Sequence, residues 1–145
     1  MAITQAIANA FKKQLLEGDQ NFASGGDKFK LALYTSSATL NSATTSFTTT
    51  NEVSNTGTYA SGGDPLAGQN TSIASGVAIV DFADLSFTGV TLTARGAMIY
   101  NTSSAVTNAA VAILDFGADK TATSGTFTIQ FPAFTTAAAI LRISG

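Results

Sequence analysis

Four aspartates, Asp81, Asp84, Asp115 and Asp119, are the clustered ionisable residues of this 145-residue chain. Paired carboxylates hydrolyse glycosidic bonds in many enzymes, and several carboxylates together can hold calcium. However, the chain contains no Asp-x-Asp-x-Asp-Gly loop, and no acid has neighbours at a spacing that would wrap an ion. We therefore expect no metal site, and we expect Asp84 and Asp119 to lie in turns, where an aspartate bonds to its own backbone.

Arg95 is the one charged residue inside a long apolar segment, residues 90–100, that is predicted to be a strand. Asp81 and Asp115 also fall within predicted strands. A charge that is buried in a protein needs a partner, because its desolvation is otherwise uncompensated. We therefore predict a structural ion pair between Arg95 and either Asp81 or Asp115.

Histidine, cysteine and tryptophan are absent from the chain. A general base that works near neutral pH is usually histidine. A thiol nucleophile, a disulfide or a zinc site of the usual kind would need cysteine or histidine. Serines are numerous, but there is no Gly-x-Ser-x-Gly elbow, and the glycine-rich residues 57–68 lack the Lys-Ser/Thr ending of a phosphate loop. We expect neither catalysis nor a cofactor.

Residues 3–17 carry apolar side chains four residues apart, at Ile3, Ile7, Phe11 and Leu15, which predicts an amphipathic helix that ends before Gly18. We therefore divide the chain into an N-terminal helix or arm, residues 1–18, and a β domain, residues 27–145. A helix of this length is marginal alone in water. It is expected to dock either on its own domain or on a neighbouring subunit.

Apolar segments, several of them alternating with polar residues, predict about eight short strands after residue 27. They are expected near residues 28–35, 45–50, 57–60, 75–82, 90–100, 109–116, 126–131 and 138–143, with turns at 101–108 and 119–125. Their spacing favours an all-β fold, either a single β-sandwich or a jelly-roll-like barrel, over alternating strands and helices.

Charged residues make up only 11% of the chain, against roughly 25% in an average soluble domain. The net charge is −2 and the cations are dispersed, so we expect no nucleic-acid partner. No segment approaches the ~18 apolar residues of a membrane span, and the N-terminus lacks the pattern of a secretory signal. We therefore expect no membrane partner and synthesis in a cytosol.

A surface with so few charges and so many serine and threonine residues suits close packing against other subunits, because little charge is desolvated on contact. Such packing would also cover exposed strand edges. The residues that we expect at subunit contacts are Ile3, Ile7, Phe11, Leu15, Phe47, Val53, Tyr59 and Leu66.

Several segments resemble small virion structural proteins of tailed bacteriophages. They are MAITQAI at residues 1–7 followed by FKK at 11–13, FKLALYTSSATL at 29–40, TARGAMIYN at 93–101 and LDFGADKT at 114–121. The similarity covers nearly the whole chain and is weakest at residues 41–72.

The resemblance implies a non-enzymatic virion protein, made in the host cytoplasm, whose partners are copies of itself and other virion proteins. The leading interpretation is a capsid decoration or cement protein that contacts the major capsid protein and stabilises the assembled head. Two alternatives remain. One is a subunit of a tail tube, fibre or other filament, and the other is a receptor-binding module at the tail tip with Tyr34, Tyr59 and Tyr100 exposed.

Overall fold

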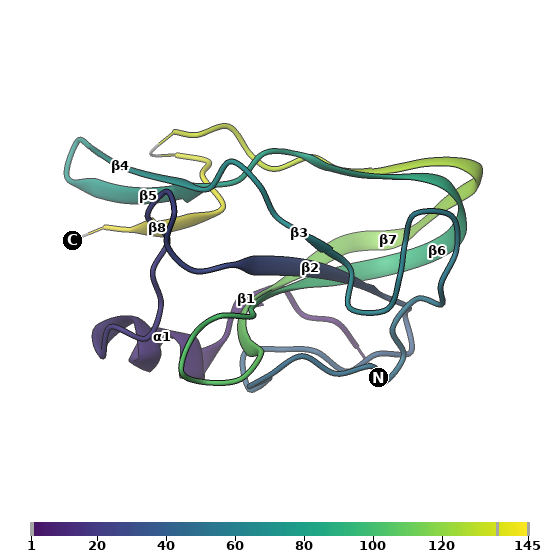
Figure 1. Cartoon of the computed structure of the whole chain (residues 1–145), viewed down its shortest axis with the longest axis horizontal. Helices are drawn as coiled ribbons and strands as arrows, with labels where there is room; N and C mark the ends of the chain where they lie inside the picture. The colour runs from purple at the N-terminus through teal and green to yellow at the C-terminus, as the bar shows by residue number, and fades with distance from the viewer. Residues whose placement is uncertain (1, 136, 145) are drawn as a thin grey trace.

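Two antiparallel sheets and one short helix make up the regular structure of residues 2–135 and 137–144, which the computed structural model describes (Figure 1). In chain order the elements are β1 (Ala6–Ile7), α1 (Asn9–Leu16), β2 (Phe29–Tyr34), β3 (Asp64–Pro65), β4 (Asn70–Ala74), β5 (Val77–Asp81), β6 (Leu85–Asn101), β7 (Ala109–Ile129) and β8 (Leu141–Ile143). This arrangement confirms the predicted all-β fold with a short N-terminal helix.

The long hairpin of β6 and β7 is the central feature of the fold. Its ladder runs from the pair Leu85 and Ile129 to the pair Asn101 and Ala109, and it contains several bulges. Figure 1 shows that the paired ribbon bends back on itself at the right-hand side, so its two halves lie in different layers. Bulges permit such a bend, because each adds an unpaired residue and increases the local twist.

The predicted turn at residues 119–125 is wrong, because these residues continue β7. Residues typical of turns are present, and Gly117 and Ser124 do have positive φ angles of 80° and 45°. In the paired ribbon, such residues are accommodated at ladder irregularities and do not reverse the chain. The predicted polar loop at residues 101–108 does connect the two strands, and Asn101 ends β6.

The larger sheet has the order β1-β7-β6-β2-β3, and the smaller sheet has the order β4-β5-β8. β2 pairs with β6 from Phe29 opposite Asn101 to Tyr34 opposite Gly96. The strands predicted at 45–50 and 57–60 form only isolated bridges, of which Ser46 with Ala109 is one. These segments are rich in serine and threonine and have few apolar side chains to pack on the core. Their bridges therefore do not extend into strands.

The helix is shorter than predicted, because residues 3–8 are extended. The Thr4 N–H donates to the Leu40 carbonyl oxygen at 2.9 Å, and the Ala8 N–H donates to the Val111 carbonyl oxygen at 3.0 Å. β1 also pairs with β7. The backbone groups that would have formed the first helical turns are therefore used by neighbouring segments, and α1 begins only at Asn9.

The hairpin of β4 and β5 was only half predicted, since residues 75–82 were expected to form one strand. The dipeptide Ser75-Gly76 instead forms the two-residue connection, with positive φ angles of 50° and 77°. Positive φ at both positions is the geometry of a tight hairpin turn, and Ser-Gly is a recognised turn dipeptide. β4 precedes this turn as an additional strand.

Aromatic side chains connect the helix to both sheets in one core. Phe22 stacks on Phe29 with ring centroids 4.4 Å apart, and it meets Phe11 at 5.8 Å and Phe82 at 6.3 Å. Phe82 also meets Phe131, at 5.9 Å. Residues 2–18 and the β strands therefore share a single hydrophobic core.

Candidate assembly surface

The structure places most of the predicted contact residues inside the chain. Five of them, Ile3, Phe11, Val53, Tyr59 and Leu66, are buried in its own core, each with 8% or less of its surface exposed. The other three, Ile7, Leu15 and Phe47, are partly buried against that core. The prediction that these five face neighbouring subunits is therefore corrected: Val53, Tyr59 and Leu66 hold the long connections after β2 on the sheets, and Ile3 and Phe11 attach the N-terminal segment to the core.

The three tyrosines proposed as exposed platforms are buried, with at most 3% of Tyr34, Tyr59 or Tyr100 exposed. Tyr34 and Tyr100 donate hydrogen bonds to backbone carbonyl oxygens at 2.7 Å and 2.6 Å, and Tyr59 donates to the Glu52 carboxylate at 2.7 Å. Burial raises the pKa of Tyr100 to about 12 and also raises the pKa of Tyr34 and of Tyr59. All three hydroxyls therefore stay protonated at neutral pH and hold loops within the fold. The prediction of a platform of exposed tyrosines is wrong.

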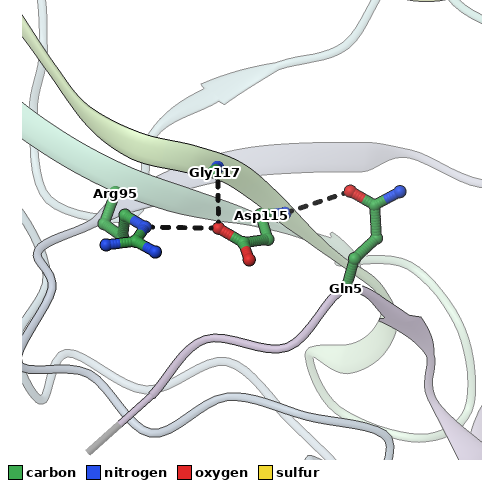
Figure 2. Close-up of polar contacts among 4 residues, drawn as sticks. All are labelled: Gln5, Arg95, Asp115 and Gly117. Carbon is green, nitrogen blue, oxygen red and sulfur yellow. Dashed lines mark hydrogen bonds and ion pairs between the residues drawn. The ribbon is translucent and has the colours of Figure 1, made fainter.

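Arg95 and Asp115 form the predicted ion pair, with Nε and Oδ1 3.3 Å apart (Figure 2). The same carboxylate oxygen accepts a hydrogen bond from the Gly117 N–H at 2.9 Å, and the Asp115 N–H donates to Gln5 Oε1 at 3.2 Å. Asp81, the other candidate, lies in the smaller sheet. The pair is not buried as expected, because 37% of the Arg95 side chain and 26% of the Asp115 side chain remain exposed.

The pKa of Asp115 is expected to stay below its ordinary value in Arg95→Met. The Gly117 N–H is the main cause of the lowered pKa, ahead of the Arg95 guanidinium. A lowered pKa in the folded state contributes stability at neutral pH, and this contribution is lost as the pH falls through that pKa. Carbon-13 NMR titration of the Asp115 carboxyl in both proteins measures the effect, and a return to the ordinary value would contradict the assignment.

The other two aspartates do not lie in local turns of the expected kind. Asp84 Oδ1 accepts a hydrogen bond from the Phe131 N–H at 2.8 Å, so it joins two distant segments. Asp119 lies within β7, where residues predicted as a turn are paired. Across residues 2–135 and 137–144, no group of three His, Cys, Asp or Glu side chains is placed to hold a metal ion.

A groove of about 740 Å³ lies between α1 and the smaller sheet. Phe11 and Leu15 line it from the helix, and Ile79, Val80 and Leu141 line it from β5 and β8. Figure 1 shows α1 and the smaller sheet at the same end of the molecule, away from the bend of the β6–β7 ribbon. Ile7 and Leu15 are therefore the predicted contact residues that are only partly buried and line this groove, which the buried Phe11 lines as well.

A buried polar network holds one wall of the groove in place. The Gln20 amide donates to Gln14 Oε1 at 2.8 Å, and the Asn101 amide donates to Gln20 Oε1 and to Asp27 Oδ2, each at 2.7 Å. Asn101 is completely buried, and Gln14 and Gln20 expose 8% and 6%. These bonds tie the connection between α1 and β2 to the end of β6, because unsatisfied buried amides would be costly.

Exposed apolar side chains surround the groove. Leu16 is 90% exposed, Ile73 is 77% exposed and Ile143 is 59% exposed. Ile73 pairs in register with Ala78, which pairs with Ile143, so the three side chains form one row on one face of the smaller sheet. Leu16 and Ile143 themselves line the groove. We call the groove together with Leu16, Ile73 and Ile143 the apolar end.

The exposure of Leu16, Ile73 and Ile143 was not predicted from the sequence. Leu16 falls within residues 3–17, which were expected to form one longer helix, whereas the actual α1 buries Phe11 and leaves Leu16 exposed. Ile73 lay in a segment that was not recognised as a strand. The Ser-Gly turn dipeptide was the signal that could have placed Ile73 on an edge strand.

Within the described residues, no helix is both long and apolar enough to cross a membrane. Lys12 and Arg142 lie at the groove beside its apolar residues.

Comparisons of the chain with family models, with curated proteins and with solved structures find no match.

Proposed function

We propose that the chain is a non-enzymatic virion structural protein of a tailed bacteriophage, made in the host cytoplasm, that decorates or cements the capsid. The observation that carries the proposal is the apolar end, where Leu16, Ile73 and Ile143 are largely exposed in a single copy. Exposed apolar surface costs roughly 25 cal/mol per Å², and a neighbouring subunit that covers it recovers this free energy. Patches of this kind mark contact sites in soluble proteins.

The resemblance of the sequence to phage virion proteins supports the choice of neighbour, which is the major capsid protein. Decoration requires no chemistry, only a rigid body that binds the assembled shell more strongly than the free subunits. The low charge content of 11% favours such packing, because few ionic groups lose their hydration on contact. The buried network at Asn101 keeps one wall of the groove rigid before contact.

A subunit of a tail tube, fibre or other filament is the second candidate. The observation that favours it is that the smaller sheet has two unlike edges, β4 and β8, in the described chain. Contacts between unlike surfaces that do not close into a ring generate filaments. Electron microscopy of the purified protein distinguishes the two candidates, since long filaments in the absence of capsids would support the second and contradict the first.

Leu16→Lys is expected to weaken binding to capsids of the parent phage that were assembled without this protein. Burying a leucine side chain contributes about 1.5–3 kcal/mol, so its loss lowers the affinity roughly 10- to 100-fold. Cosedimentation of labelled protein with capsids measures the affinity. The matched control is Val106→Lys, because Val106 is an exposed apolar residue of the loop between β6 and β7. Equal binding by Leu16→Lys and the unchanged protein would contradict the proposed contact.

A further inference from the structure

The two sheets of the described chain have four edge strands, and three of them carry features that oppose pairing with another strand. β1 and β3 are two residues long, and β3 contains Asp64 and Pro65; β8 is three residues long and contains Arg142. Short length, proline and charge are the devices by which proteins protect sheet edges. β4 has none of them: its five residues, Asn-Thr-Ser-Ile-Ala, are uncharged and all exposed.

The turn between β4 and β5 fixes which backbone groups of β4 are free. Ser75 and Gly76 form a two-residue connection, so Ala74 and Val77 are the hydrogen-bonded pair that closes the hairpin. Hydrogen-bonded and non-hydrogen-bonded pairs alternate along an antiparallel ladder. Every second residue of β4 therefore directs its backbone groups away from β5.

The outward-facing backbone groups belong to Thr71 and Ile73, because Ser72 and Ala74 bond to β5. In agreement with this, the Thr71 N–H is bonded to the side chain of Asn70, at 2.9 Å, and not to β5. The Asn70 side chain accepts from one of these groups only, whereas a second strand can replace that bond and pair with all of them, since N–H and C=O groups alternate at strand spacing along another strand.

We propose that β4 pairs with β4 of a second copy, antiparallel about a two-fold axis at Ser72. In this register Thr71 of each copy lies opposite Ile73 of the other copy, and the outward groups form about four hydrogen bonds. If the two-fold axis instead lay at Thr71 or at Ile73, some of these backbone groups would have no partner within β4 of the other copy. The edge is thus complementary to itself, and the absence of charge in β4 means that no like charges are brought together.

The apolar row of the smaller sheet supports the same pairing. Ile73 is 77% exposed in one copy, and its neighbours in the row are Ala78 and Ile143. Pairing places the Thr71 side chain of the second copy directly beside Ile73, on the same face. The three-stranded sheets of the two copies become one continuous sheet. This contact holds whether or not the protein belongs to a virion.

A cysteine experiment tests the register directly, because the chain contains no cysteine of its own. Across the two-fold axis the two Ser72 residues form a non-hydrogen-bonded pair with Cα atoms about 4.5 Å apart, within the range of a disulfide. The two Thr71 residues lie diagonally, roughly 7–8 Å apart, beyond that range. Under mild oxidation, Ser72→Cys should give roughly tenfold more disulfide-linked dimer than the matched control Thr71→Cys.

A second variant tests the hydrogen bonds without relying on oxidation. Ile73→Pro removes the outward N–H but leaves the bonds of β4 to β5, so the chain should fold with an unchanged circular dichroism spectrum and sediment as a monomer. Val106→Lys, in the loop between β6 and β7, should remain a dimer. A monomeric unmodified protein, or equal linking of Ser72→Cys and Thr71→Cys, overturns the inference. Capsid binding by such a protein would leave the proposed function standing.

Discussion

Gly63→Ala is expected to lower the free energy of unfolding by about 3–5 kcal/mol, a large part of the stability of a small domain. Gly63 has a φ angle of +74°, and a Cβ atom at this position would overlap the Leu31 carbonyl oxygen and lie 2.9 Å from the Ala32 Cα. Neither neighbour can move easily, because both belong to the backbone of β2. Urea denaturation followed by circular dichroism measures the change.

Gly76→Ala is the matched control for this substitution. Gly76 has a φ angle of +77°, nearly that of Gly63, but nothing lies within 4 Å of the added Cβ. Its expected cost is about 1–2 kcal/mol, from the positive φ alone. The difference between the two variants isolates the close approach of residue 63 to β2. Equal losses for the two variants would show that this approach does not constrain the fold.

Phe22→Ala is expected to lower the free energy of unfolding by about 3–5 kcal/mol, through lost burial and the cavity that remains. Phe22 is only 6% exposed and meets three other phenylalanines, with its closest stacking on Phe29 at 4.4 Å. It lies outside every helix and strand, yet it attaches the connection between α1 and β2 to the core. Differential scanning calorimetry at neutral pH measures the loss.

Leu16→Ala is the control for Phe22→Ala, since Leu16 is 90% exposed and lies at the same end of the molecule. Its expected effect on unfolding is within about 0.5 kcal/mol. A loss below about 1 kcal/mol for Phe22→Ala would mean that the surrounding rings close over the cavity, and the groove wall would then be less rigid than we infer.

The fold class was predictable because buried strands leave a local pattern. Phe29, Leu31 and Leu33 alternate with other residues in β2, and the alternation of Phe127 and Ile129 marks the end of β7. The length of the β6–β7 hairpin was not predictable in the same way. Glycine and serine with positive φ serve turns and bulges alike, and only the presence of a paired strand decides which one forms.

The ion pair could likewise be predicted from the sequence, whereas the apolar end could not. The position of Arg95 within an apolar strand predicted an acidic partner, and Asp115 is that partner. Sequence spacing could not tell which apolar residues of long connections fill the core, because that depends on segments far away in the chain. Val53, for example, is buried beside β2, where its N–H donates to the Leu33 carbonyl oxygen at 2.9 Å, a contact across twenty residues of sequence.

The position of β8 has a consequence for the order of events during folding. β6 and β7 are joined by a short loop, so they can pair early. Leu141–Ile143 must instead pair with β5, some sixty residues upstream, and this pairing is slower because closing the longer loop costs more conformational entropy. Leu141 and Ile143 also line the groove. The groove therefore cannot be complete until residue 143 has left the ribosome, so its wall from the smaller sheet is the last part of it to form.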